Sequence, residues 1–137
     1  MIIKQISIFV ENKPGRLAEI TKIIAKNNIN IRALSVADTT HFGILRIIVD
    51  NPEEVERVLK AEGLTVSITS VITACIHNRP GGLAEVLEVL SENDITIEYM
   101  YAFIAKSENE AYVVMRIEAE GAAVKLLTEH GFTGMEE

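Results

Sequence analysis

An internal repeat restricts the possible folds of this chain more than any other feature of its sequence. Residues 12–19, NKPGRLAE, recur as residues 78–85, NRPGGLAE, at an offset of 66 residues. At this offset, ten of the 27 positions from Ile6 to Arg32 are identical in the two copies, and after a two-residue insertion residues 43–49 align with residues 111–117. Such self-similarity indicates one supersecondary unit that is used twice. The sequence therefore predicts two domains, one over residues 1–70 and one over residues 71–137.

The residue pattern within the first repeat predicts its elements in turn. Ile2–Val10 is rich in β-branched residues and ends at an Asn-x-Pro-Gly turn, which indicates a strand. Residues 16–26 place apolar side chains at helical spacing, and residues 29–36 and 42–49 contain two further β-branched runs. Asn51-Pro52 begins a second helix that ends at Gly63, and residues 65–68 form the last strand. The order βαββαβ is the ferredoxin-like plan, so we expect an α+β fold with two such units.

Each copy leaves one face of its antiparallel sheet without helices, so a single copy of roughly 70 residues would be marginally stable. Only Thr69 and Ser70 separate the last predicted strand of the first repeat from the first predicted strand of the second. We therefore expect the copies to pack side by side in one sheet, with the helices on one face. After Thr133 only four residues follow. The last strand of the second repeat is thus expected to be short or missing, and a partner chain or the N-terminal strand could cover that edge.

The charge distribution argues against nucleic acid as a partner. The formal net charge is −7, and the residues after position 68 carry four Lys or Arg against twelve Asp or Glu. A surface that binds phosphates needs clustered cations, and the aromatic content of 5% disfavours base stacking. The longest uncharged apolar stretch, residues 64–76, is too short for a membrane-spanning helix, and the N-terminal residues resemble no export signal. We expect no nucleic-acid partner, no membrane partner and a cytoplasmic location.

No set of residues in the sequence predicts catalysis. Cys75 is the only cysteine, and the three histidines, His41, His77 and His130, lack the spacing of a metal site. The sequence contains no Ser-His-Asp or Cys-His arrangement and no Gly-rich phosphate loop. Cys75 is expected to be a small core residue of a strand. We therefore expect no enzyme activity, no catalytic residue, no bound metal and no cofactor.

The Asn-x-Pro-Gly loop before each predicted first helix is the candidate binding site. Gly15 and Gly81 let a ligand approach the backbone, and N–H groups at the following helix start can donate to a carboxylate. Asn12 and Asn78 can both donate and accept, which suits the two ends of a zwitterion. The alternative is that each asparagine caps a helix and each Pro-Gly only makes the turn. The candidate ligand-binding residues are Asn12, Lys13, Pro14, Gly15, Arg16, Leu17, Asn78, Arg79, Pro80, Gly81, Gly82 and Leu83.

The two repeats differ in the strand that follows the first helix. Tyr99, Tyr101 and Phe103 alternate and should share one sheet face, whereas the matching residues of the first repeat are small: Ala33, Ser35 and Ala37. The large side chains either fill the space left by the small ones across a pseudo-twofold interface or form the wall of a ligand pocket. Interface packing is the favoured interpretation.

The element order, together with Asn-Lys-Pro-Gly-Arg-Leu and Asn-Arg-Pro-Gly-Gly-Leu between first strand and first helix, resembles the ACT domain family. The resemblance covers nearly the whole chain and implies a tandem ACT protein without a catalytic domain. It implies an allosteric sensor that binds a free amino acid at these loops and the adjoining sheet edge, at the interface of ACT units. It also implies a possible homodimer or docking to a metabolic enzyme. The alternative is a non-catalytic docking module that regulates a metabolic enzyme without binding a small molecule.

Overall fold

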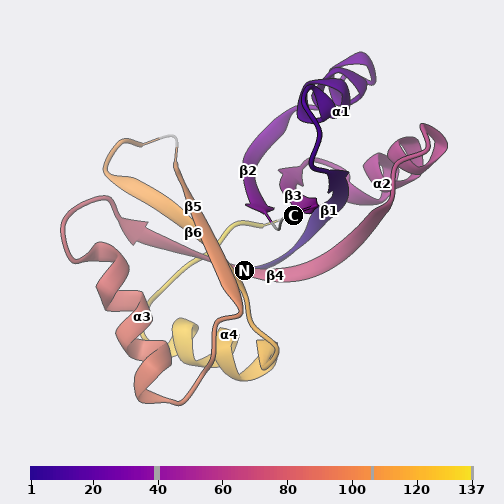
Figure 1. Ribbon diagram of the computed structural model, residues 1–137. Coiled ribbons are helices and arrows are strands. Elements are labelled where there is room, and N and C mark those ends of the chain that lie inside the picture. The colour runs from indigo at the N-terminus through magenta and orange to yellow at the C-terminus, as the bar shows by residue number, and fades with distance from the viewer. Residues whose placement is uncertain (39–40, 106, 137) are drawn as a thin grey trace. The chain divides into compact units, whose positions relative to one another are not determined.

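The computed structural model describes residues 1–38, 41–105 and 107–136 (Figure 1). The described residues form two compact units, an N-terminal unit of residues 4–69 and a C-terminal unit of residues 1–3 and 70–137. The βαββαβ pattern occurs twice in this α+β fold, as the sequence predicts, with β4 used by both copies and the last strand of the second copy missing among the described residues. The elements in chain order are β1 (Ile2–Glu11), α1 (Arg16–Lys26), β2 (Ile31–Asp38), β3 (Phe42–Val49), α2 (Pro52–Ala61), β4 (Val66–His77), α3 (Gly82–Glu92), β5 (Tyr99–Ile104), β6 (Glu110–Arg116) and α4 (Glu120–Glu129).

One strand differs from the sequence expectation. The predicted strands on either side of Thr69 and Ser70 are a single 12-residue strand, β4. No glycine or proline lies between Val66 and His77, and hydroxyl and β-branched residues continue an extended chain without interruption. The first four residues of β4 belong to the N-terminal unit and the other eight to the C-terminal unit.

The core of the N-terminal unit lies between its antiparallel sheet and the helices α1 and α2. In β1, Ile6, Ile8 and Val10 are buried, because alternate side chains of a strand point to the same face. They pack with Ile20 and Ile24 of α1 and with buried residues of α2, namely Val55 and Leu59. Strand β3 pairs with both β1 and β2, and its Gly43 is the partner of Val10 in β1 and of Asp38 in β2. These pairings place the end of β2 beside the loop that follows β1.

The C-terminal unit repeats this arrangement with β4, β5, β6 and the helices α3 and α4. Its core contains Ile72 and Ala74 of β4 and Val113 and Met115 of β6, packed under residues of the helices such as Leu90 and Leu127. The register pairs Ile104 of β5 with Ala111 of β6, which is the counterpart of the Asp38 and Gly43 pair. Among the described residues, none of the four helices is long and apolar enough to cross a bilayer.

The chain after α4 lies along β4 without forming a further strand in its described part. The N–H of Cys75 donates to the carbonyl of Thr133 (2.7 Å), and the N–H of Thr73 donates to the carbonyl of Met1 (2.8 Å). The N-terminal ammonium in turn donates to the carbonyl of Met135 (2.9 Å). A Cβ on Gly134 would lie 2.9 Å from the Cα of Met1, so this approach requires glycine. The first residues of β1 and the C-terminal tail therefore share the place that a last strand would occupy.

Candidate functional site

The two Asn-x-Pro-Gly loops adopt the same backbone conformation. Gly15 precedes α1 with φ 80° and Gly81 precedes α3 with φ 87°. Both angles lie in the left-handed region, which residues other than glycine rarely adopt. In each loop a short turn precedes the helix: the N–H of Lys13 donates to the carbonyl of Glu11, and the N–H of Arg79 donates to that of His77, both at 2.9 Å. The repeated glycine is thus required by the turn itself.

The two loop asparagines do not cap the helices. Asn12 donates its side-chain Nδ2 to Oδ1 of Asp38 (3.2 Å), and Asn78 donates its Nδ2 to the carbonyl of Glu108 (2.8 Å). Each backbone N–H also donates to the neighbouring hairpin, Asn12 to His41 (3.0 Å) and Asn78 to Asn109 (2.8 Å). The interpretation of these asparagines as helix caps is therefore wrong. Their role is to tie each loop to the hairpin beside it, and no described side chain caps the start of α1 or α3.

A pocket of about 330 Å³, the first pocket, lies between the first loop, the start of α1 and the end of β2. It contains charges of both signs: Glu11 and Asp38 are acidic, and Lys13 and Arg16 are basic. Its lining consists of Val10, Glu11, Asn12, Lys13, Gly15, Arg16, Leu17, Ala18, Val36, Asp38 and Gly43. Five of the six candidate residues of the first repeat are in this lining, and Pro14 is not.

Three charged groups of the first pocket, those of Glu11, Lys13 and Arg16, form ion pairs that reach solvent. Nζ of Lys13 lies 2.7 Å from Oε2 of Glu11, and this hydrogen bond lowers the pKa of the glutamate. Nη1 of Arg16 lies 2.8 Å from Oε2 of Glu19. Exposed pairs of this kind contribute little to stability, so an incoming charged group can rearrange them at little cost.

A second pocket of about 280 Å³ lies beside the second loop, within the C-terminal unit. Its lining consists of Ile76, His77, Asn78, Arg79, Leu83, Ala102, Phe103, Ile104 and Ala111. Three candidate residues of the second repeat are in this lining, whereas Pro80, Gly81 and Gly82 are not. Arg79 is the only Lys, Arg, Asp or Glu among the described residues around this pocket, and its Nη2 lies 2.8 Å from Oε1 of Glu85.

Three substitutions between the repeats account for the different charges of the pockets, and one of them is His77 in the place of Glu11. Ile104 occupies the place of Asp38, since each is the last residue of its strand and pairs with the equivalent residue of the next one. Gly82 occupies the place of Arg16, and a Cβ on Gly82 would lie 3.1 Å from the carbonyl carbon of His77 and closer still to its oxygen. Gly82 is therefore required by packing of α3 against β4.

Several lining residues are not evident from the sequence motif, above all Asp38. It lies 22 positions beyond Arg16 in the chain, and only the register of β2 and β3 brings it to the loop. Of the alternating aromatic residues, Phe103 lines the second pocket and contacts Tyr112 at a centroid distance of 5.6 Å. Tyr99 and Tyr101 are not among the residues that line the second pocket. This pocket therefore gives neither of them the role of a ligand wall.

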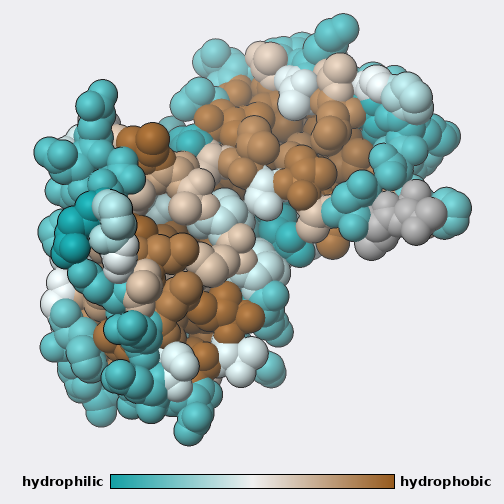
Figure 2. Space-filling model, turned by 60° about the vertical axis from the view of Figure 1, so that its left-hand side comes forward, coloured by the Kyte–Doolittle hydropathy of each residue, from teal (hydrophilic) through white to brown (hydrophobic). Residues whose placement is uncertain are grey.

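Apolar side chains remain exposed beside both pockets. Leu17 is 41% exposed and Val36 is 46% exposed at the first pocket, and Leu83 (42%) and Ile104 (66%) are exposed at the second. Apolar residues, brown in Figure 2, are visible on the surface of both units. These side chains give each pocket an apolar rim that is open to solvent.

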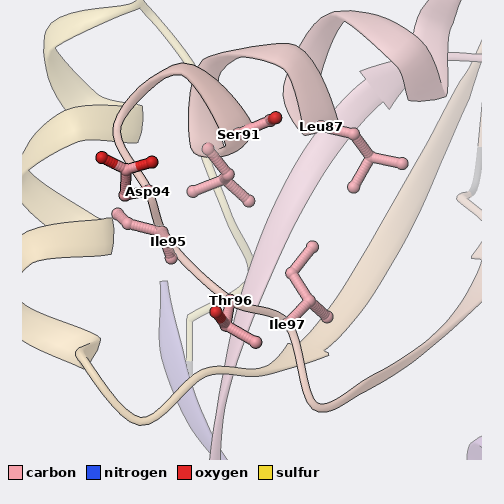
Figure 3. Close-up of a pocket in the computed structure, with 7 residues that line it drawn as sticks. Leu87, Ser91, Asp94, Ile95, Thr96 and Ile97 are labelled. Carbon is pink, nitrogen blue, oxygen red and sulfur yellow. The ribbon is translucent and has the colours of Figure 1, made fainter.

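A hollow of about 510 Å³ at the end of α3 has a different character. Leu87 and Ser91 come from α3, and Asp94, Ile95, Thr96 and Ile97 come from the segment that leads to β5 (Figure 3). Asp94 is the only charged residue among its described lining residues. The hollow therefore presents no cation to a carboxylate, and it is a weaker candidate for an amino-acid site than the first pocket.

The single cysteine is not a core residue, contrary to the sequence expectation. Cys75 is half-buried, and its thiol donates to Oε2 of Glu110 at 2.9 Å. Burial, with the neighbouring Glu110 carboxylate, raises the pKa of the Cys75 thiol from 9.0 to about 11. No group of His, Cys, Asp and Glu among the described residues could hold a metal ion.

We expect alkylation of Cys75 to be slow near neutral pH. The thiolate is the reactive form, and at about pH 8 the folded chain contains almost none of it. Because the pKa is raised in the folded state, the stability that this thiol contributes is present below about pH 9 and is lost as the pH rises toward 11. Mass spectrometry after iodoacetamide treatment at a series of pH values measures the rate. A rate at pH 8 equal to that of free cysteine would contradict this expectation, and Glu110→Gln should increase it.

Comparisons with known proteins place the chain in a family. The family model described as an ACT domain pair matches residues 1–134. The crystal structure of protein BT0572 from Bacteroides thetaiotaomicron is 43% identical, with a TM-score of 0.91, and the match covers 98% of this chain and 92% of that one. No curated protein matched.

Two more distant structures share the fold. The regulatory subunit of aspartate kinase from Thermus thermophilus, in its ligand-free form, has a TM-score of 0.66 at 16% identity, with 96% of this chain and 97% of that chain covered. The corresponding subunit from Thermus flavus has a TM-score of 0.63 at 16% identity, with 94% of each chain covered. With the family model spanning nearly its whole length, this chain belongs to the ACT domain family as an ACT domain pair.

Proposed function

We propose that this protein is a non-catalytic regulatory sensor that binds a free amino acid in the first pocket. The observation that carries the proposal is the presence of both signs of charge in one small pocket beside the start of a helix. A zwitterion needs an anionic partner and a cationic partner a few ångströms apart. The first pocket offers both, and its volume of about 330 Å³ suits a molecule the size of an amino acid.

The carboxylate of the ligand is placed at the start of α1. The first N–H groups of a helix have no partner within the helix, and no side chain caps the start of α1, where Leu17 and Ala18 line the pocket. The helix dipole and the guanidinium of Arg16 add favourable electrostatic interactions with an anion at this point. Gly15 leaves open space here, since a Cβ on it would contact no described atom within 4 Å.

The ammonium of the ligand is placed at the end of β2. Asp38 offers its carboxylate there, held in position by the hydrogen bond from Asn12, and Glu11 lines the same pocket. The remaining lining is aliphatic, with Val10, Leu17 and Val36 as its larger members. An apolar amino acid such as valine, leucine or isoleucine therefore fits the chemistry of the pocket.

A second ACT unit is proposed to close the site. Leu17 and Val36 expose nearly half of their surface beside the pocket, and a bound apolar side chain would extend this exposed surface. Coverage by a homodimer partner or by a metabolic enzyme would bury both. The ligand would then change the affinity of the protein for that partner, which is the physical content of an allosteric sensor.

A thermal-shift screen of the twenty amino acids on the full chain tests the proposal. A ligand that binds only the native state stabilises it by about 2.7 kcal/mol at a hundredfold excess over its Kd. We expect a rise in Tm with one or a few apolar amino acids and no turnover of them. If none of the twenty raises the Tm, the proposal is wrong, and a docking module without a small-molecule ligand becomes the better interpretation.

Asp38→Asn is expected to weaken amino-acid binding by roughly tenfold to a hundredfold, because a hydrogen bond to a charged group contributes about 1.5–3 kcal/mol. The substitution keeps the shape of the side chain and removes only its charge. Isothermal titration with the best ligand of the screen measures the effect. The matched control is Asp50→Asn, since Asp50 pairs with Arg32 at 3.6 Å and is absent from the pocket lining. Equal affinities in the two variants would show that Asp38 does not hold the ammonium.

A further inference from the structure

We infer that the second pocket binds a different class of ligand from the first, an apolar monocarboxylate without an ammonium group, such as the 2-oxo acid counterpart of an apolar amino acid. The inference rests on the proposed function for one point only, that an Asn-x-Pro-Gly loop receives a carboxylate. The evidence is the replacement of particular charged residues between two loops that otherwise share one backbone.

The cationic side of the second pocket is retained. Arg79 follows Asn78 in the loop as Lys13 follows Asn12, and it lines the pocket. Its Nη2 is paired with Glu85, but the guanidinium has five N–H donors, so it can hold a second carboxylate at the same time. Asn78 is fixed by its two hydrogen bonds to the β5–β6 hairpin, at 2.8 Å each, which keeps this side of the pocket in place.

The anionic side of the second pocket is lost. Ile104 stands where the first repeat has Asp38, and His77 stands where it has Glu11. The lining residues that the structure describes include no carboxylate, so an ammonium group placed here would lose its hydration without gaining an ionic partner. A zwitterion is therefore disfavoured, whereas an anion of the same size is not.

The rest of the wall is more apolar than in the first pocket. The apolar lining of the second pocket consists of Ile76, Leu83, Phe103, Ile104 and two alanines, Ala102 and Ala111. Gly82 cannot be replaced by a second cation, because any Cβ there would collide with the carbonyl of His77. One cation and an aliphatic and aromatic wall match a monocarboxylate with an apolar chain. The two pockets together would let one chain respond to an amino acid and to its deaminated counterpart.

Three probes with the same carbon skeleton test the inference on the full chain: 4-methyl-2-oxopentanoate, 4-methylpentanoate and leucine. Titrations are followed by amide and methyl shifts in NMR spectra, which locate each ligand at Asn78, Arg79 and Leu83 or at Asn12, Lys13 and Leu17. At the second pocket, followed by the shifts of Asn78, Arg79 and Leu83, we expect the oxo acid to bind at least about tenfold more tightly than leucine does. Equal binding of 4-methylpentanoate would show that the carboxylate and the chain, without the oxo group, are recognised.

Two variants assign the binding to the residues named above. Arg79→Gln should weaken the oxo acid about tenfold or more, and Ile104→Asp should do the same by placing an anion beside the ligand. Neither should change the shifts at Asn12 and Leu17. The inference is overturned if the oxo acid causes no saturable shift at the second pocket at about 10 mM, or if Arg79→Gln leaves its binding unchanged. The proposed function fails separately, through the amino-acid screen and Asp38→Asn.

Discussion

Gly82→Ala is expected to destabilise the C-terminal unit by about 3 kcal/mol or more, the largest effect of any single methyl group that could be added near the loops. The new Cβ would lie 3.1 Å from the carbonyl carbon of His77 and closer to its oxygen. That carbonyl accepts the N–H of Arg79 at 2.9 Å, so moving it disrupts the turn as well as the end of β4. Chemical denaturation followed by circular dichroism measures the loss.

Gly121→Ala is the matched control for this change. Gly121 is the second residue of α4, as Gly82 is the first of α3, but a Cβ on it contacts nothing within 4 Å among the described atoms. Alanine is a better helix former than glycine by about 0.5–1 kcal/mol, so the control should be neutral or more stable than the parent. If both variants have the stability of the parent, α3 does not pack against His77 as closely as the structure shows.

Gly15→Val is expected to abolish amino-acid binding at the first pocket while the protein still folds. The residue has φ 80°, so valine is strained by roughly 1–3 kcal/mol, but the added side chain meets no described atom within 4 Å. Gly15 lines the first pocket, and we expect the valine side chain to project into it. Binding should therefore fall by more than the loss of stability explains, as isothermal titration and a melting curve together show.

Gly63→Val separates backbone strain from loss of the site. Gly63 has φ 86° and the same open surroundings, yet it follows α2 and is absent from the pocket lining. We expect a similar loss of stability and unchanged binding. Gly81→Val, compared with Gly131→Val, gives the same comparison for the second loop, where Gly81 does not line the pocket and a smaller effect on ligand binding is expected. Parent-like binding in Gly15→Val would mean that the first loop is only a turn.

Local sequence information was sufficient for the elements and their order. The run from Arg16 to Lys26 forms α1 over those residues, and residues 42–49 form β3, because hydrophobic periodicity and turn residues act over a few positions. Pro52 begins α2 and Gly63 follows it with positive φ, as proline and glycine preferences predict. The internal repeat identified the Pro-Gly loops, in which both glycines adopt the left-handed backbone that favours glycine. The break predicted at Thr69 was wrong, since no turn residue occurs there to end β4.

The composition of the pockets was decided only by the tertiary structure. Asp38 and Ile104 are far from the loops in sequence and reach them through the register of neighbouring strands, which depends on pairings across the whole sheet. The role of Gly82 was also decided by the tertiary structure. In the sequence it is a second glycine of the binding motif, but in the structure it is helical, and glycine is needed there because α3 contacts His77. The side chains of Asn12 and Asn78 donate hydrogen bonds to the adjacent hairpins and not to the helices that follow them, because each loop folds back onto its hairpin. Local patterns specify elements, and long-range packing specifies which side chains share a pocket.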